Sequence, residues 1–285
     1  MKKPAILFRK SLAEEEEFLS AHKYFGYPIV EQRTNIPEGS LVIGRYSVLP
    51  YYSELEQDLY TRGSALVNSI HAHNIIANVY RWYGTFADVT PKTWESWEGL
   101  ERIPCSFVLK GKTNSRKHQW DTHMFAETYK DIGIVANRLL DDSFIRDQGL
   151  VIREYIPLEQ FDIGIGGVPI TNEWRFFFYF GRLVDYGYYW SNFPEHEPKN
   201  GPGTEAIEFA IRCNKRLYNQ SPGINFFVLD IAKTQEGKWI LIEVNDGQMS
   251  GLSSIPPDRF YENLHAVVSE TFIANCIREE PCLND

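Results

Sequence analysis

The chain has 285 residues and a net charge of −9, and hydrophobic residues make up 43% of it, as in ordinary globular proteins. Its length favours roughly two domains. The negative charge excludes a general nucleic-acid-coating role, although a local basic groove is compatible with it. No apolar stretch approaches membrane-spanning length, so we expect no membrane association. The four cysteines lie far apart without a CxxC pair, which indicates reduced thiols and a cytoplasmic protein.

The first ninety residues predict a small α/β domain with a partly parallel sheet. Short apolar runs indicate strands, and capping residues or helical spacing indicate helices. Strands are expected at Ala5–Phe8, Pro28–Gln32 and Leu41–Ile43, and helices after Ser11, at Tyr52–Arg62 and at Ile70–Tyr83. A proline interrupts this pattern within Thr90–Thr93, so we expect a domain boundary there, with domains at 1–90 and 91–285.

The rest of the chain alternates strands and helices in a different order. Strands are expected at Ser106–Lys110, Val151–Ile156, Glu173–Phe180 and Arg182–Trp190, with two more in Phe226–Gly247. Helices are expected at about Met124–Leu140, Glu205–Tyr218 and Phe260–Ile277. A polar loop with several cations, Gly111–His118, follows the first of these strands. This order predicts a second, larger domain of mixed α and β structure.

Two acids and an amide lie at matched positions on the two strands of Phe226–Gly247. Glu243 and Asn245 are two residues apart, so their side chains project from the same face of a strand. Asp230 belongs to the preceding strand and can lie across the hairpin from them. Oxygen ligands of this kind suit Mg²⁺ when a triphosphate supplies the remaining oxygens. The alternative is an exposed polar face, but the apolar neighbours of Glu243 favour the metal site, because buried carboxylates need a cation.

Taken in order, the elements after Pro91 resemble the ATP-grasp superfamily. The likeness rests on a strand ending in Lys110, a polar loop, a helix, a Glu-Tyr-Ile strand, a Glu-x-Arg strand, and the Asp and Glu-x-Asn strands. Each motif is weak alone, and the ordered set is more specific. The resemblance implies an ATP-grasp fold of two α+β subdomains that grip ATP, preceded by a small α/β pre-ATP-grasp domain. It is strongest to a compact phage and bacterial clade.

The same resemblance assigns cationic residues to the ATP phosphates. It implies that Lys110 reaches the α and β phosphates and that Arg175 contacts the transferring phosphate. The structural alternatives are a strand-end lysine that reaches to water and a salt bridge from Arg175 to Glu173. The loop has fewer glycines and serines than is usual in the family. Lys112 is therefore expected to carry part of the phosphate role, with Lys117 as an equal alternative.

Glu154-Tyr155-Ile156 resembles the segment that binds adenine in this superfamily. The resemblance implies that Glu154 accepts a hydrogen bond from the adenine amino group and that Tyr155 and Ile156 supply main-chain groups. A ribose-binding acid usually follows within a turn, and Glu159 and Asp162 both remain open. The structural alternative is an ordinary strand that ends before the next proline.

Two residues outside these motifs are candidates for binding the substrate. Arg45 ends a strand of the first domain, where ligands often dock in α/β proteins, and it could grip a carboxylate. A structural arginine is an equally good interpretation. Ser250 lies in the loop after Asn245, which would suit a substrate-facing loop. His71 and His73 lie two apart on a predicted helix and point away from each other, so we interpret them as structural rather than metal-binding.

These features lead to the hypothesis of an ATP-dependent carboxylate–amine ligase that uses ATP with Mg²⁺, or alternatively Mn²⁺. ATP would phosphorylate a carboxylate, and an amine would then displace phosphate from the acyl phosphate. Small molecules or peptides are the expected substrates, and the sequence leaves a macromolecular acceptor and a homodimer open. A phosphotransferase and a non-catalytic ATP-binding or sensor module are the alternatives. The presence of all three metal-ligand types argues against the latter.

Overall fold

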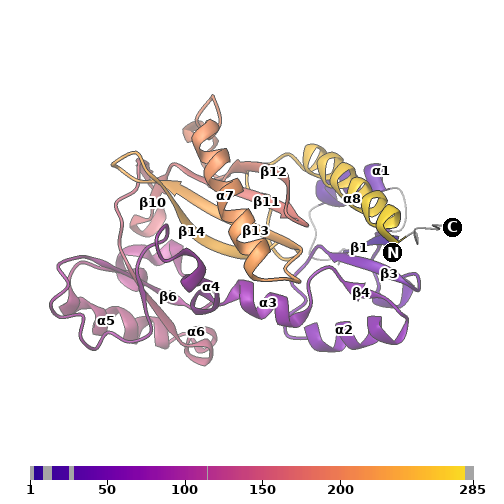
Figure 1. Cartoon of the computed structure of the whole chain (residues 1–285). Coiled ribbons are helices and arrows are strands. Elements are labelled where there is room, and N and C mark those ends of the chain that lie inside the picture. The colour runs from indigo at the N-terminus through magenta and orange to yellow at the C-terminus, as the bar shows by residue number, and fades with distance from the viewer. Residues whose placement is uncertain (1–2, 9–14, 26–28, 114, 280–285) are drawn as a thin grey trace.

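The N-terminal region is a parallel sheet, as Figure 1 shows at its right side. The computed structural model describes residues 3–8, 15–25, 29–113 and 115–279. In sheet order β2-β1-β3-β4, all pairs are parallel. The elements are β1 (Lys3–Leu7), α1 (Glu15–Phe25), β2 (Ile29–Val30), β3 (Ser40–Gly44), α2 (Tyr52–Thr61) and β4 (Ala65–Leu66). The predicted α/β region is therefore present, and its sheet is wholly rather than partly parallel. Ser11 and Pro28, where the sequence predicted a helix and a strand to begin, lie outside the described residues.

Two short helices connect this region to the rest of the chain. The sequence predicted one helix over Ile70–Tyr83, but the structure has α3 (Ile70–Ala77) and α4 (Val79–Phe86). The break falls at Asn78, whose backbone is extended and whose side chain accepts a hydrogen bond from Tyr80 N (3.1 Å). Asparagine competes for local backbone donors in this way, so it caps a new helix instead of continuing the old one.

A small antiparallel sheet follows, in the order β5-β8-β6-β7. Its elements are β5 (Thr93–Trp94), β6 (Phe107–Gly111), β7 (Phe125–Ala126), α5 (Tyr129–Leu140), α6 (Ser143–Gln148) and β8 (Leu150–Glu154). The predicted helix from Met124 begins only at Tyr129. The reason is that β7 pairs with β6, and Thr128 caps α5 through a reciprocal bond with Asp131.

The large sheet is antiparallel and has the order β12-β11-β13-β14. The elements from the small sheet to the C-terminus are β9 (Gln160–Ile163), β10 (Pro169–Thr171), β11 (Glu173–Tyr179), β12 (Arg182–Tyr188), α7 (Thr204–Gln220), β13 (Phe226–Lys233), β14 (Trp239–Asp246) and α8 (Pro257–Glu279). β9 and β10 form a separate hairpin that the sequence did not predict. Among the described residues, no helix is long and apolar enough to cross a membrane.

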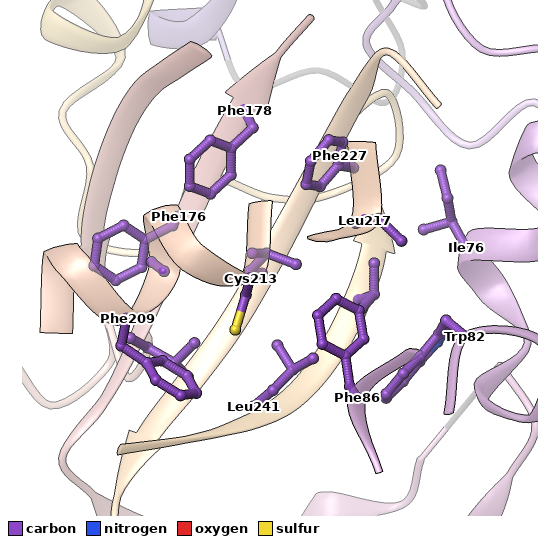
Figure 2. Close-up of a cluster of buried hydrophobic side chains, with 14 of the residues drawn as sticks. Ile76, Trp82, Phe86, Phe176, Phe178, Phe209, Cys213, Leu217, Phe227 and Leu241 are labelled. Carbon is purple, nitrogen blue, oxygen red and sulfur yellow. The ribbon is translucent and has the colours of Figure 1, made fainter. Parts of the chain in front are cut away.

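Alternating aromatic side chains of β11 bury both faces of the large sheet. Phe176 and Phe178 pack on one face with residues of α3, α4 and α7, as Figure 2 shows. Phe177 and Tyr179 pack on the opposite face with residues of α8, α1 and the N-terminal sheet. Because successive side chains of a strand point to opposite faces, a strand with this alternation holds two layers together. The N-terminal sheet therefore shares a core with the large sheet.

Arg153 links the small sheet to the large one. Its Nη1 donates to the carbonyl oxygen of Ile242 on β14 (2.6 Å), and its Nη2 donates to Thr90 Oγ1 (2.6 Å). Burial lowers the pKa of this guanidinium to about 10, so it remains charged at neutral pH. These bonds hold the two sheets face to face, and the space between them is where the candidate site lies.

Candidate active site

The three predicted metal ligands meet on one face of the β13–β14 pair. Asp230 lies directly opposite Glu243, and Asn245 lies opposite Val228. The Nδ2 of Asn245 donates to Asp230 Oδ2 at 3.1 Å. The set holds two carboxylates and one amide. Within the described ranges, no three Asp, Glu, His or Cys side chains form a metal cluster. The structure thus brings together the residues that the spacing predicted.

Arg175 is the cation nearest to Asp230. The two residues are paired across β11 and β13, and the guanidinium Nε and Nη2 donate to the two carboxylate oxygens at 2.8 Å each. A fork of two such bonds is the strong geometry for an arginine and a carboxylate. Nη1 also donates to the Gly251 carbonyl (3.0 Å). Arg175 therefore pairs with Asp230, and the alternative salt bridge to Glu173 does not form.

Lys110 joins the small sheet to Glu243. It lies on β6, and its Nζ donates to Glu243 Oε1. Burial by itself would raise the pKa of Glu243, but the positive charges of Lys110 and Lys117 outweigh it and lower that pKa to about 2. Glu243 is consequently ionised at neutral pH and is held by a lysine from the opposite sheet.

A cavity of about 120 Å³, called here the inner cavity, lies between the small and large sheets. Lys110 and Glu243 line it, and so do Glu154, Tyr155 and Ile156. Apolar side chains from both sheets complete the wall: Val108, Met124, Leu158, Ile240 and Ile242. The inner cavity therefore combines charged groups with apolar walls.

The segment Glu154–Ile156 lines the cavity as predicted, but its main chain is partly in use. The N–H of Glu154 donates to the Lys92 carbonyl and that of Tyr155 to the Ser106 carbonyl, both at 2.8 Å. The Ile156 N–H has no backbone partner among the described residues. The Tyr155 ring packs edge-on against Phe125 (5.0 Å between centroids) and serves as wall. Ile156 is thus the residue whose backbone donor is available to a planar ligand.

The two acids considered for ribose, Glu159 and Asp162, do not line the inner cavity. Glu159 accepts a hydrogen bond from Asn172 Nδ2 (2.9 Å). Asp162 belongs to the exposed strand β9, and its Oδ2 lies 3.1 Å from His196 Nε2. Both side chains are directed to partners outside the cavity. Gln160 lines it instead. Ribose binding by Glu159 or Asp162 therefore stays a prediction.

Glu173 is an acid that the sequence analysis did not assign to the site. It lines the inner cavity, is 3% exposed, and its Oε1 has no hydrogen-bond partner among the described residues. Burial raises its pKa to about 7; Lys117 and Arg175 oppose this shift, and Asp230 and Glu243 add to it. A buried carboxylate oxygen without a hydrogen bond is costly unless a ligand donates one to it. Its signal in the sequence was its position on the same strand face as Arg175.

The structure separates the two loop lysines. The Nζ of Lys112 lies over the Tyr80 ring, 5.7 Å from its centroid, and Lys112 does not line the cavity. Lys117 does line it, and its Nζ donates to the hydroxyl of Tyr189 at 2.8 Å. Of the two, Lys117 is the lysine that borders the cavity, and the phosphate role of Lys112 stays a prediction. A loop's course decides where its side chains point, and residue spacing alone does not reveal that course.

A second cavity of about 700 Å³, called here the outer cavity, adjoins the first. Both cavities are lined by Lys117, Val168 and Trp190. Arg175 and the first turn of α1 also line the outer cavity. The charged end of the inner cavity therefore meets a second space that is bordered by the N-terminal region.

Arg45 and Ser250 lie at the junction of the N-terminal region with the loop after β14, but neither lines the two cavities. The guanidinium of Arg45 donates to Glu17 Oε1 from Nε (3.0 Å) and Nη2 (2.7 Å), and to the Ser250 carbonyl from Nη1 (3.1 Å). Ser250 Oγ donates to the Asp246 carbonyl (2.8 Å). Both residues bind the chain itself, which is consistent with the structural interpretation, and their substrate-binding role stays a prediction.

A buried polar network fixes the end of β14 next to the metal-ligand set. Asp246 accepts from Asn68 Nδ2 (2.9 Å) and from the Gln248 N–H (3.0 Å), and its other oxygen lies 3.1 Å from His73 Nδ1. The Asn68 side chain also accepts from the N–H of Phe226 at the start of β13 (3.0 Å). The structural interpretation of His73 is consistent with these contacts.

Comparison with protein families then decides the affiliation. Residues 98–264, more than half of the chain, match the model described as ATP-grasp domain, R2K clade family 3. The chain is an ATP-grasp protein of this family. Members of the ATP-grasp superfamily are mostly ATP-dependent carboxylate–amine ligases. No curated protein matches the sequence.

Solved structures extend the likeness beyond the matched span. The D-alanine–D-alanine ligase from Bacillus anthracis, complexed with ATP, has a TM-score of 0.60 and 13% identity, over 98% of this chain and 99% of that one. A RimK-domain ATP-grasp protein from Sphaerobacter thermophilus gives 0.58 and 14%, over 93% and 99%. The ligase PsnB with its minimal precursor gives 0.56 and 12%, over 94% and 99%. Such low identities support the ATP-grasp fold alone, and they do so over nearly the whole chain.

Proposed function

We propose that this ATP-grasp protein is an ATP- and Mg²⁺-dependent ligase that joins a carboxylate to an amine through an acyl phosphate. One observation carries the proposal: Lys110 and Glu243 line the inner cavity, and Arg175 lines the outer one. Asp230 links them, since it pairs with Arg175, lies opposite Glu243 and accepts from Asn245, so the set spans the junction of the two cavities. A nucleotide in the inner cavity would direct its terminal phosphate to this junction, and an acid in the outer cavity would meet it there.

The inner cavity supplies matching groups for each part of a nucleotide. The free N–H of Ile156 and the carboxylate of Glu154 suit the edge of adenine, and the apolar walls suit its faces. Glu173, in place of the two acids considered from sequence, would accept hydrogen bonds from the ribose hydroxyls. Its unpartnered Oε1 supports this role, since a hydroxyl donor would remove the cost of leaving it unsatisfied.

The donor set fits a hard divalent cation. Asp230 and Glu243 face each other across the strands, and the amide of Asn245 uses its Nδ2 on Asp230, which leaves its oxygen as a donor. Mg²⁺ held by these three residues would neutralise charge on the phosphate oxygens. The cations that now pair with the carboxylates, Arg175 and Lys110, would turn to the phosphates as the metal replaces them. The exchange leaves no buried charge uncompensated.

The chain's own residues account for the transfer by electrostatics. A carboxylate oxygen of the acid forms a bond to the γ-phosphorus while the bond to the bridging oxygen breaks, and its electron pair leaves with ADP. Lys110 and Arg175, once turned to the phosphates, would stabilise this shifting charge with their N–H donors. The nitrogen of the amine then forms the bond to the acyl carbon, phosphate leaves with the carbon–oxygen electron pair, and the nitrogen releases a proton to solvent.

The test is release of ADP and phosphate from ATP and Mg²⁺ with a panel of amino acids, short peptides and amines, with the product mass recorded. We expect release only when an acid and an amine are both present, with a product of the condensed mass. ADP formed without an amine, together with a phosphorylated acceptor, would replace the ligase by a phosphotransferase. Nucleotide binding without turnover across the panel would indicate a binding module.

A further inference from the structure

Lys117 occupies a position between the two cavities. Three residues line both cavities, and of these Lys117 carries a charge while Val168 and Trp190 are apolar or aromatic. A phosphoryl group that passes from a nucleotide in the inner cavity to an acid in the outer one must cross this junction. A cation there can contact the group before, during and after transfer.

The side chain of Lys117 is held in place. Its Nζ donates to the Tyr189 hydroxyl at 2.8 Å, lies 4.0 Å from Glu173 Oε1, and lies 5.1 Å from the centroid of the Trp190 ring. Burial alone would lower its pKa, but Tyr189, Glu173 and Glu243 together raise it, so the ammonium stays charged. The lysine is thus a fixed cation, unlike an exposed lysine that samples many rotamers.

Tyr189 connects this lysine to Arg175. The guanidinium carbon of Arg175 lies 4.9 Å from the centroid of the Tyr189 ring, and Lys117 Nζ lies 4.0 Å from it. The ring therefore contacts both cations. The N–H of Tyr189 donates to the carbonyl of Glu173 (3.0 Å), which continues the pairing of β11 with β12. The tyrosine is therefore anchored through its backbone to the strand that carries Arg175.

Close glycine packing fixes the backbone around Lys117. The turn Lys117–Gln119 rests against the turn Ile165–Gly167 at the tip of the β9–β10 hairpin. A Cβ at Gly166 would overlap the carbonyl oxygen of His118, and both glycines of this tip have positive φ (68° and 82°). Only glycine allows this contact without strain. Lys117 is positioned by its backbone as well as by its side-chain partner.

We infer that Lys117 is a catalytic residue that contacts the γ-phosphoryl group, and that Tyr189 is the positioning residue that holds it at the junction. The inference rests on the nucleotide placement of the proposed function. The lysine stays protonated: the acid's oxygen bonds to phosphorus, the bridging bond breaks with its electrons on ADP, and Lys117 neither gives nor takes a proton. Its contribution is charge complementarity to the moving group.

Calorimetry with Mg²⁺ compares two probes, ADP and a β,γ-imido analogue of ATP. Lys117→Met is expected to weaken binding of the analogue by about 10- to 100-fold, the usual loss for a charged hydrogen bond, and to change ADP binding less than about 2-fold. Tyr189→Phe keeps the ring and loses the hydroxyl, so it should weaken the analogue alone by a smaller factor. The double variant should match Lys117→Met, because Tyr189 acts through the lysine.

Lys112→Met and Tyr80→Phe form the matched control, since this lysine–tyrosine pair lies in the same part of the fold but outside both cavities. Neither control should change the ratio of the two affinities. Equal losses for ADP and the analogue, no loss in Lys117→Met, or additive losses in the double variant would each overturn the inference. This readout needs no ligation, so intact discrimination by Lys117 alongside a failed condensation assay would count against the ligase alone. Absence of binding of either nucleotide would overturn both.

Discussion

The junction around Arg45 and the site around Arg175 use the same two groups, a buried guanidinium and a carboxylate, in different ways. Arg45 meets Glu17, the Ser250 carbonyl and other acceptors of the chain, and it lines neither the inner nor the outer cavity. Arg175 also donates from Nε and Nη2, but to the two separate oxygens of Asp230, and it lines the outer cavity. The comparison teaches that a buried arginine becomes a site candidate through the space it borders and not through its partner.

The largest effect is expected at the site around Arg175. Glu243→Gln should reduce ADP formation by about 10²- to 10³-fold, because it removes an anionic metal ligand from the transfer site and leaves Lys110 without its partner. Turnover with Mg²⁺ and a competent acid–amine pair is the measurement. Glu236→Gln, on the exposed turn of the same hairpin, is the control and should be unaffected. Wild-type turnover in Glu243→Gln would remove the metal assignment.

Substitution of Arg45 should change the stability of the protein and not its turnover. Arg45→Met is expected to lower the free energy of unfolding by about 3–5 kcal/mol, since Glu17 would be left partly buried without its cation. Urea unfolding measures this change, and adding Glu17→Gln should restore part of it. KM values of the folded variant should stay near wild type. Unchanged stability with a raised substrate KM would return Arg45 to the substrate site.

Glu173 allows the site around Arg175 to be tested through the pH dependence of stability. Its folded-state pKa of about 7 lies above the ordinary value, so the folded protein holds this proton more tightly than the unfolded chain does. The resulting stability is fully present below about pH 4.5 and is lost as pH rises through about 7. Glu173→Gln should remove this decline and raise stability at pH 8 by about 1–3 kcal/mol. An identical pH profile of unfolding in the variant would contradict it.

The smallest effect is expected from the lysine that lies outside both regions. Lys112→Ala should change the KM for ATP by less than about 2-fold, because its ammonium lies over the Tyr80 ring at partial exposure. Steady-state kinetics against ATP concentration tests this. A rise of more than about 10-fold would restore Lys112 to the phosphate site and weaken the distinction drawn from cavity lining.

The order of elements and the shared face of Glu243 and Asn245 could be predicted because both are local properties of sequence. Glu243 and Asn245 share a face by two-residue spacing, and the aromatic alternation of β11 marks a strand buried on both sides. The ATP-grasp resemblance followed from that order, and the family match confirms it. The interruption at Asn78 was missed because helical spacing continued through a residue that also caps helices.

The contacts of the site could not be predicted, because they depend on register and loop course. Pairing Arg175 with Asp230 requires the alignment of β11 with β13, two strands separated by a long helix. The partners of Arg45 come from residues 17 and 250, at opposite ends of the chain. Glu159 and Asp162 were plausible from distance along the chain, but in the structure they contact Asn172 and His196 and do not line the inner cavity. The predicted boundary at residue 90 stays a prediction.

The Asn68 side chain has a consequence for how the molecule is made. It bonds to Phe226, 158 residues later, and the N-terminal strand residues Ile6 and Phe8 share their core with Phe260 of α8. On a ribosome that emits the chain from its N-terminus, the first sheet must wait for most of the protein before this apolar face is covered. The N-terminal sheet is thus synthesised well before its packing is completed, and a translation arrest before α8 leaves an exposed apolar face that favours aggregation.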